Sequence, residues 1–141
     1  MKKVTLTFLT LVLVSCSSTV KRTESKSLFE VLTQQSDGGA SIRFFEILSE
    51  PDEIAMLKND EKLKDKIQPN DILTSNFIVL NMGEKATGGY QIGIENVVET
   101  DKNIILTIKE TIPKPDATVL QVVTYPYCIV RINSKKEIII K

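Results

Sequence analysis

Alternation of apolar and polar residues marks the second half of this 141-residue chain and restricts it to a β-rich fold. In residues 90–98 and 104–112, apolar side chains recur at every second position and so share one face, which is typical of half-buried strands. Residues 76–82 are apolar on both faces, which predicts a central strand covered on two sides. We expect the core to contain residues at this spacing: Phe77, Val79, Ile92, Ile94, Ile104, Leu106, Ile108, Val122 and Ile129.

Two further β segments follow toward the C-terminus. Residues 119–132 form a long β-branched run that Pro126 interrupts. Because proline cannot donate to a strand ladder, we expect a bend, a bulge or a sheet edge at Pro126. Residues 137–140 predict a last short strand after a polar turn. If the strands from residue 76 to residue 124 run as an up-and-down meander, the loops 83–89 and 113–118 lie at the same end of the sheet.

The first half of the chain predicts a hairpin followed by a helix. Residues 28–34 and 40–48 are strand-like, and a Ser-Asp-Gly-Gly turn cluster separates them. Ser49 is a suitable N-cap for a helix that Pro51 opens, and Gln68-Pro69-Asn70 ends this segment. We therefore expect one α+β domain over residues 28–141, mostly antiparallel β with one surface helix.

Composition excludes several function classes. The chain has 18 basic and 18 acidic residues; without the first fifteen, which hold two lysines and no acid, 16 basic and 18 acidic residues remain, a net charge of about −2. That balance does not suit nucleic-acid binding, which needs a basic face. There is no histidine, so Ser-His-Asp triads, Cys-His pairs and imidazole zinc sites are excluded. We expect neither an enzyme nor a metal protein.

The N-terminus predicts export and lipid attachment. Two lysines precede an 11-residue apolar run, which is too short to span a bilayer but fits a signal peptide over residues 1–15. Leu13-Val14-Ser15-Cys16 resembles a bacterial lipobox, so we expect cleavage after Ser15 and lipid on the Cys16 sulfur. An ordinary secretory signal with an incidental cysteine is the alternative.

The segment after Cys16 indicates how the protein is held. Residues 16–27 are polar and rich in Ser and Thr, which predicts a tether to the membrane. The residue after Cys16 is Ser17 and not a retention aspartate, so the outer membrane is the favoured location in a host that has an outer membrane. The covalent lipid is the only cofactor that we expect. Cys128 is then left without a disulfide partner, and its apolar surroundings predict a buried, inert thiol.

The sharpest local features are two short motifs. Residues 83–90 (GEKATGGY) join two strands, and the simplest interpretation is a glycine turn in which Gly88 and Gly89 adopt positive φ. A phosphate loop is excluded, because no Gly-Lys-Ser/Thr and no helix follow. Residues 124–127 (TYPY) read as two aromatics beside a kinked strand.

Taken with the prolines of residues 113–116, these motifs resemble the PrcB C-terminal domain family of protease complex subunits. The resemblance covers roughly residues 29–133 and rests on the order of the Gly-x-x-x-Thr-Gly-Gly-Tyr loop, the proline loop and Thr-Tyr-Pro-Tyr. The chain departs from the family at Ala86, where proline is frequent, and at Cys128, where histidine is frequent.

The resemblance implies an accessory, non-catalytic, lipid-anchored subunit that binds or stabilises a secreted or surface protease. A looser similarity to chagasin-type inhibitors of cysteine proteases makes a protease inhibitor on the same loops one alternative, and a structural envelope lipoprotein is another. We expect two kinds of partner: the membrane, through the lipid, and a protease or other envelope protein. The predicted partner-binding residues are Thr87, Gly88, Gly89, Tyr90, Pro113, Pro115, Tyr125, Pro126 and Tyr127.

Overall fold

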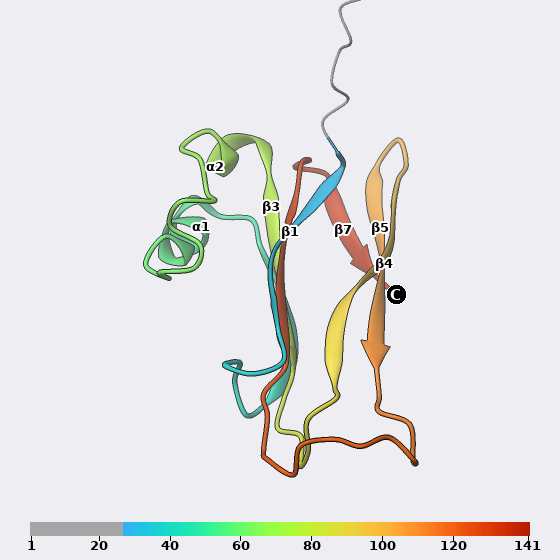
Figure 1. The fold of residues 1–141 in the computed structure, drawn as a ribbon. Coiled ribbons are helices and arrows are strands. Elements are labelled where there is room, and N and C mark those ends of the chain that lie inside the picture. The colour runs from blue at the N-terminus through green and yellow to red at the C-terminus, as the bar shows by residue number, and fades with distance from the viewer. Residues whose placement is uncertain (1–26) are drawn as a thin grey trace, which may run out of the picture.

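A computed structural model describes residues 27–141. They form two β-sheets that face each other as layers, with the helices outside one of them (Figure 1). The predicted signal peptide, Cys16 and nearly all of the tether lie outside the described residues. No helix in the described part of the chain is long and apolar enough to cross a membrane.

The first sheet has four strands, all antiparallel to their neighbours. Their order across the sheet is β1 (Phe29–Gln35), β6 (Tyr127–Ile132), β3 (Asn76–Met82) and β2 (Arg43–Leu48). β3 therefore lies inside this sheet, as its two apolar faces predict.

The second sheet has three strands, in the order β4 (Gln91–Glu99), β5 (Asn103–Thr111) and β7 (Glu137–Ile140). β4 and β5 form an antiparallel hairpin, whereas β7 pairs with β5 in parallel. The main core fills the space between the two sheets. It consists of Ile78, Leu80, Met82, Ile92, Ile104, Leu106, Cys128, Val130, Ile132 and Ile138.

Two short helices, α1 (Pro51–Leu57) and α2 (Asp71–Thr74), cover the outer face of the first sheet (Figure 1). The N-cap of α1 is Glu50 rather than Ser49. The Glu53 carboxylate accepts hydrogen bonds from the N–H groups of Ser49 and Glu50, both at 3.0 Å, so the start of α1 carries a capping box.

A second apolar cluster lies between these helices and the sheet, and a buried ion pair supports it. The cluster consists of Leu32, Leu48, Ile54, Leu63, Ile67, Phe77, Tyr127 and Ile129. Beside it, Arg131 of β6 donates to the Asp71 carboxylate at 2.8 Å, and both side chains are buried. The same Asp71 oxygen accepts the N–H of Gln68 at 2.9 Å, so the pair links the helical segment to the sheet.

The α+β class and the predominance of antiparallel strands are confirmed. The expected single helix is instead two, because the four-residue α2 was not predicted. The predicted hairpin of residues 28–34 and 40–48 is wrong. β1 and β2 lie at opposite edges of the first sheet, since β6 and β3 insert between them.

The predicted meander is also wrong, because β3 and β4 belong to different sheets. Gly83 has φ +75° and lets the chain leave the first sheet directly after β3. Residues 119–124 form no strand; within the part of the chain that the structure describes, they make one isolated bridge, between Lys85 and Thr124. Val122 is consequently 51% exposed instead of buried. The other eight expected core residues are buried or partly buried.

Candidate partner-binding surface

Three loops meet at one end of the two sheets: residues 36–42, 83–90 and 112–126. We call this region the loop end; it lies at the bottom of Figure 1. Each loop adjoins the end of a strand of the first sheet, and these ends are neighbours. Tyr127, at the start of β6, pairs with Gln35 at the end of β1 and with Asn81 near the end of β3. The strand register thus brings these three segments, distant in sequence, to one place.

Backbone hydrogen bonds join the 83–90 and 112–126 loops. Lys85 and Thr124 exchange two N–H···O bonds of 2.9 Å, and the Gly88 N–H donates to the carbonyl of Leu120 at 2.9 Å. The Thr124 hydroxyl donates to the carbonyl of Thr87, also at 2.9 Å. The prediction that the glycine loop and the proline loop are neighbours is therefore confirmed, although the meander that motivated it is wrong.

Gly89 is required by the conformation of this loop. Its φ is +90°, and a Cβ atom placed there would lie 3.0 Å from both Pro113 Cβ and Val119 Cγ1. Gly88 does not share this constraint, because its φ is not positive and its nearest neighbour would be 3.5 Å away, at Leu120 Cβ. Of the two glycines predicted to adopt positive φ, only Gly89 does.

The 36–42 loop is held by Asn81, a buried polar residue at the end of β3. Its Oδ1 accepts the Ala40 N–H at 3.0 Å, and its Nδ2 donates to the carbonyls of Ala40 and Ile42. Both amide hydrogens and the oxygen of this side chain are thereby paired inside the protein. Gly39 donates its N–H to the Tyr125 carbonyl at 2.8 Å, which connects this loop to the 112–126 loop.

Tyr125 is held from two sides at the loop end. Its N–H donates to the Asp37 carboxylate at 3.0 Å, and its hydroxyl donates to the Glu84 carboxylate at 3.2 Å. The hydrogen bond to Glu84 and the negative charge of that group raise the pKa of the phenol above its ordinary value near 10. Tyr125 therefore stays neutral at physiological pH and acts as a hydrogen-bond donor.

The nine predicted partner-binding residues are all placed in or next to the loop end, but with different accessibility. Gly89 and Pro115 are exposed, whereas Thr87, Gly88, Tyr90, Pro113 and Tyr125 are half-buried. Pro126 and Tyr127 are buried. The Tyr127 ring packs in the cluster beneath the helices, where its hydroxyl accepts a hydrogen bond from Lys62 at 3.2 Å. These two residues support the loop from inside and add nothing to its surface.

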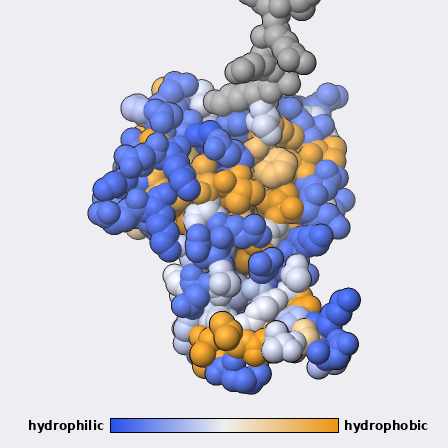
Figure 2. Space-filling view, viewed as in Figure 1, coloured by the Kyte–Doolittle hydropathy of each residue, from blue (hydrophilic) through white to orange (hydrophobic). Residues whose placement is uncertain are grey.

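Exposed aliphatic side chains form much of the surface of the loop end. The sequence interpretation did not single them out: Ile42 is 75% exposed, Ile112 66%, Leu120 74%, Val122 51% and Val123 50%. Apolar residues are visible at this end in Figure 2. A usable signal was present, because the apolar run of residues 119–123 lies between prolines that prevent a regular strand. Clustered exposed apolar side chains of this kind mark interaction sites.

The described residues hold neither a cluster of metal-ligating side chains nor an accessible thiol. Across residues 27–141, no group of three or more acidic or cysteine side chains could hold a metal ion. Cys128 is fully buried, and burial raises the pKa of its thiol to about 11. The thiol is therefore protonated and inaccessible, as predicted.

Fold and surface together define a small β-rich module of α+β class that presents a hydrogen-bonded, partly apolar set of loops at one end. Residues 76–133 match the family described as PrcB C-terminal, which confirms the resemblance over β3 to β6 and over two of the three loops. The name of this family is that of an accessory subunit and not of an enzyme. Comparisons with curated proteins and with solved structures gave no match.

Proposed function

We propose that this chain is a non-catalytic accessory protein of the bacterial cell envelope that binds or stabilises a secreted or surface protease through its loop end. The observation that carries the proposal is the set of exposed aliphatic residues on loops that are hydrogen-bonded to one another. Most of this surface belongs to the segment that matches the PrcB C-terminal family. A fixed backbone lowers the entropic cost of association, and the apolar side chains supply area to bury.

The direction of β1 supports an anchored protein that presents this surface outward. β1 begins at Phe29, which pairs with Ile132, and ends at Gln35, which pairs with Tyr127 beside the loops. The described chain therefore enters at the end opposite the loop end (Figure 1). Lipid on Cys16 and a tether over residues 16–27 would hold the domain at the membrane, with the outer membrane favoured. The loop end would then point away from the lipid.

A pull-down from detergent-solubilised membranes of the bacterial host tests the proposal. The full chain carries an affinity tag, and Leu120→Asp is compared with Val98→Asp, an aliphatic residue of similar kind that is 45% exposed on β4. We expect wild type and Val98→Asp to recover a protease subunit, identified by mass spectrometry, and Leu120→Asp to recover at least tenfold less. Equal recovery with both variants, or recovery without any protease, contradicts the proposal.

Protease inhibition on the same loops is the competing function, and the burial of Pro126 and Tyr127 does not favour it. The assay for it is direct: the purified chain is added to the recovered protease acting on a peptide substrate. A lower rate would support inhibition, whereas an unchanged or higher rate supports an accessory role.

A further inference from the structure

β2 presents a free sheet edge. Among residues 27–141 it pairs with β3 alone, through six consecutive residue pairs. The Met82 N–H donates to the Pro126 carbonyl, on the β6 side of β3, at 2.9 Å. In an antiparallel ladder, successive residues of a strand direct their N–H and C=O groups to opposite sides. The residue before Met82 is Asn81, so its backbone groups point toward β2, where Phe44 is its partner.

The same alternation fixes the direction of the other backbone groups of β2. Phe44, Glu46 and Leu48 use theirs to pair with β3, so Arg43, Phe45 and Ile47 direct their N–H and C=O groups to the open edge. A row of open backbone groups on a regular strand is a template for an added strand.

The other long edge strands carry protection that β2 lacks. β1 has a register shift between Val31 and Thr33, and β4 has one between Ile94 and Asn96. Such bulges discourage pairing with a further strand. The register of β2 shows no shift. Among the long edge strands of residues 27–141, β2 is thus the one with an uninterrupted register.

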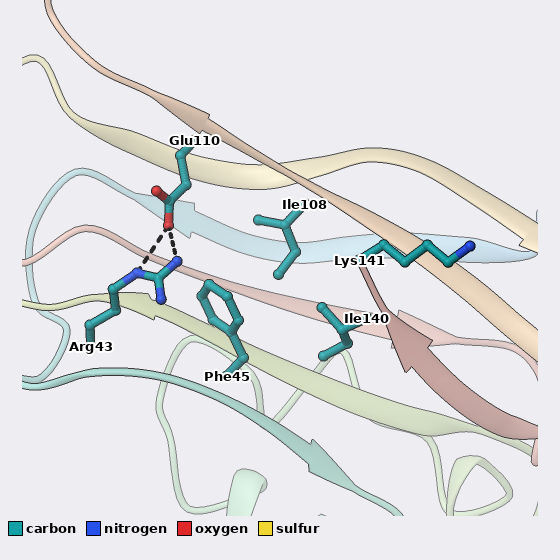
Figure 3. A pocket seen from close by; sticks show the side chains of 6 residues that line it. All are labelled: Arg43, Phe45, Ile108, Glu110, Ile140 and Lys141. Atoms are coloured by element: carbon teal, nitrogen blue, oxygen red, sulfur yellow. Dashed lines mark hydrogen bonds and ion pairs between the residues drawn. The ribbon is translucent and has the colours of Figure 1, made fainter.

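A partly apolar groove, whose lining also holds the charged residues Arg43, Glu110 and Lys141, accompanies this edge on the side of the second sheet. It has a volume of about 640 Å³, and Phe45 of β2 faces Ile108 and Ile140 across it (Figure 3). Arg43 and Glu110 form an ion pair of 2.8 Å at one end of the groove. A strand added beside β2 would turn every second side chain to this apolar side.

A different groove lies on the opposite face of β2, toward α1. Its volume is about 360 Å³ and its apolar lining includes Leu48 and Val79. Glu46, Glu53 and Asp60 are also in the lining, and none of these carboxylates pairs with a Lys or Arg side chain of residues 27–141. This side therefore complements a long basic side chain, whose aliphatic stem suits the apolar lining and whose cation suits the carboxylates.

We propose that β2 binds an extended segment of a partner protein in which apolar and basic residues alternate, as an added strand of the first sheet. The backbone of the segment pairs with Arg43, Phe45 and Ile47, while its apolar and basic side chains occupy the two grooves. Main-chain bonds then supply affinity and alternate side chains supply specificity, as in other strand-addition complexes. This site is separate from the loop end and does not depend on its proposed role.

Hydrogen exchange read by NMR tests the site directly. The isotope-labelled full chain, kept in mild detergent, is titrated with the peptide Lys-Val-Lys-Val-Lys-Val-Lys. We expect exchange of the Arg43, Phe45 and Ile47 amides to slow at least tenfold at saturation, with no comparable change at Phe44 and Glu46. Saturation without this alternating pattern overturns the proposal.

Matched controls separate backbone pairing from charge attraction. A peptide with alternate N-methylated amides cannot pair as a strand, and one with Glu in place of Lys has the wrong charge, so both should bind at least tenfold more weakly. Glu46→Lys should weaken binding by a similar factor, whereas Asp65→Asn, which lies outside the groove, should not. Equal binding of the N-methylated peptide overturns the proposal.

A second copy of this chain is the alternative occupant of the β2 edge. Protection of the three amides without peptide, together with a dimer in sedimentation, overturns the proposal in favour of that second copy.

Discussion

The two adjacent glycines of the 83–90 loop should respond with opposite sign to the same substitution. Gly89 has φ +90°, and a Cβ atom there would lie 3.0 Å from Pro113 and from Val119. Gly88 has no positive φ, and its Cβ would lie 3.5 Å from Leu120, an ordinary contact distance. The pair is therefore a matched test of backbone conformation with almost no change in surroundings.

The expected magnitudes follow from these two geometries. An alanine held in the left-handed region costs about 1–3 kcal/mol, and the two 3.0 Å contacts place Gly89→Ala in the upper part of that range. Gly88→Ala lowers the conformational entropy of the unfolded chain at a position where the folded protein tolerates a side chain. It should therefore stabilise the folded protein by about 0.4–1 kcal/mol. The two free energies of unfolding should thus differ by at least about 1.5 kcal/mol.

Urea unfolding followed by far-UV circular dichroism measures the difference, since the chain has no tryptophan for fluorescence. The full chain is used for wild type and both variants. If Gly88→Ala and Gly89→Ala lose equal stability, the assignment of the strain to Gly89 is refuted. In the pull-down, Gly89→Ala should also reduce protease recovery, because the displaced Pro113 and Val119 belong to the loop end.

Three further predictions concern the anchor, the helical segment and Tyr125. Cys16→Ser should abolish lipid attachment and leave the signal peptide in place; unchanged mass and detergent partitioning relative to wild type would contradict this. Asp71→Asn should cost about 3 kcal/mol in urea unfolding, because it leaves the buried Arg131 guanidinium with less compensation, and a loss below about 1 kcal/mol would show that the pair is dispensable. Glu84→Gln should lower the phenol pKa of Tyr125 toward 10, since it replaces the charged acceptor of the phenol's hydrogen bond by a neutral one and removes the negative charge that disfavours the phenolate; an unchanged ultraviolet titration at high pH would contradict this assignment to Glu84.

Much of the local structure of this chain could be predicted from the sequence. The approximate bounds of β4 and β5 follow from alternation, those of β3 from a run that is apolar on both faces, and those of β7 from a short apolar run after a polar turn. The helix start near Pro51 follows from local capping chemistry. These features depend on residues close together in sequence, so no tertiary contact is needed to infer them.

The sheet to which each strand belongs could not be inferred in this way. Alternation defines two faces for a strand but does not name its neighbours, so the 28–34 and 40–48 segments were expected to pair although β6 and β3 separate them. The site shows the same division. The glycine and proline composition indicated the loops, yet the exposure of Val122 and the burial of Tyr127 depend on contacts with distant elements.

The sequence by itself therefore determined the periodicity, the turn chemistry and the family resemblance, each carried by neighbouring residues. Only the tertiary structure decided which surfaces remain open. Tyr127 turns toward the helices because an apolar cluster is available there, whereas Leu120 and Val122 stay exposed because the 112–126 loop crosses between the sheets without packing against either core cluster. Likewise, β2 is an open edge because the pairing order of the first sheet gives it no second neighbour within residues 27–141.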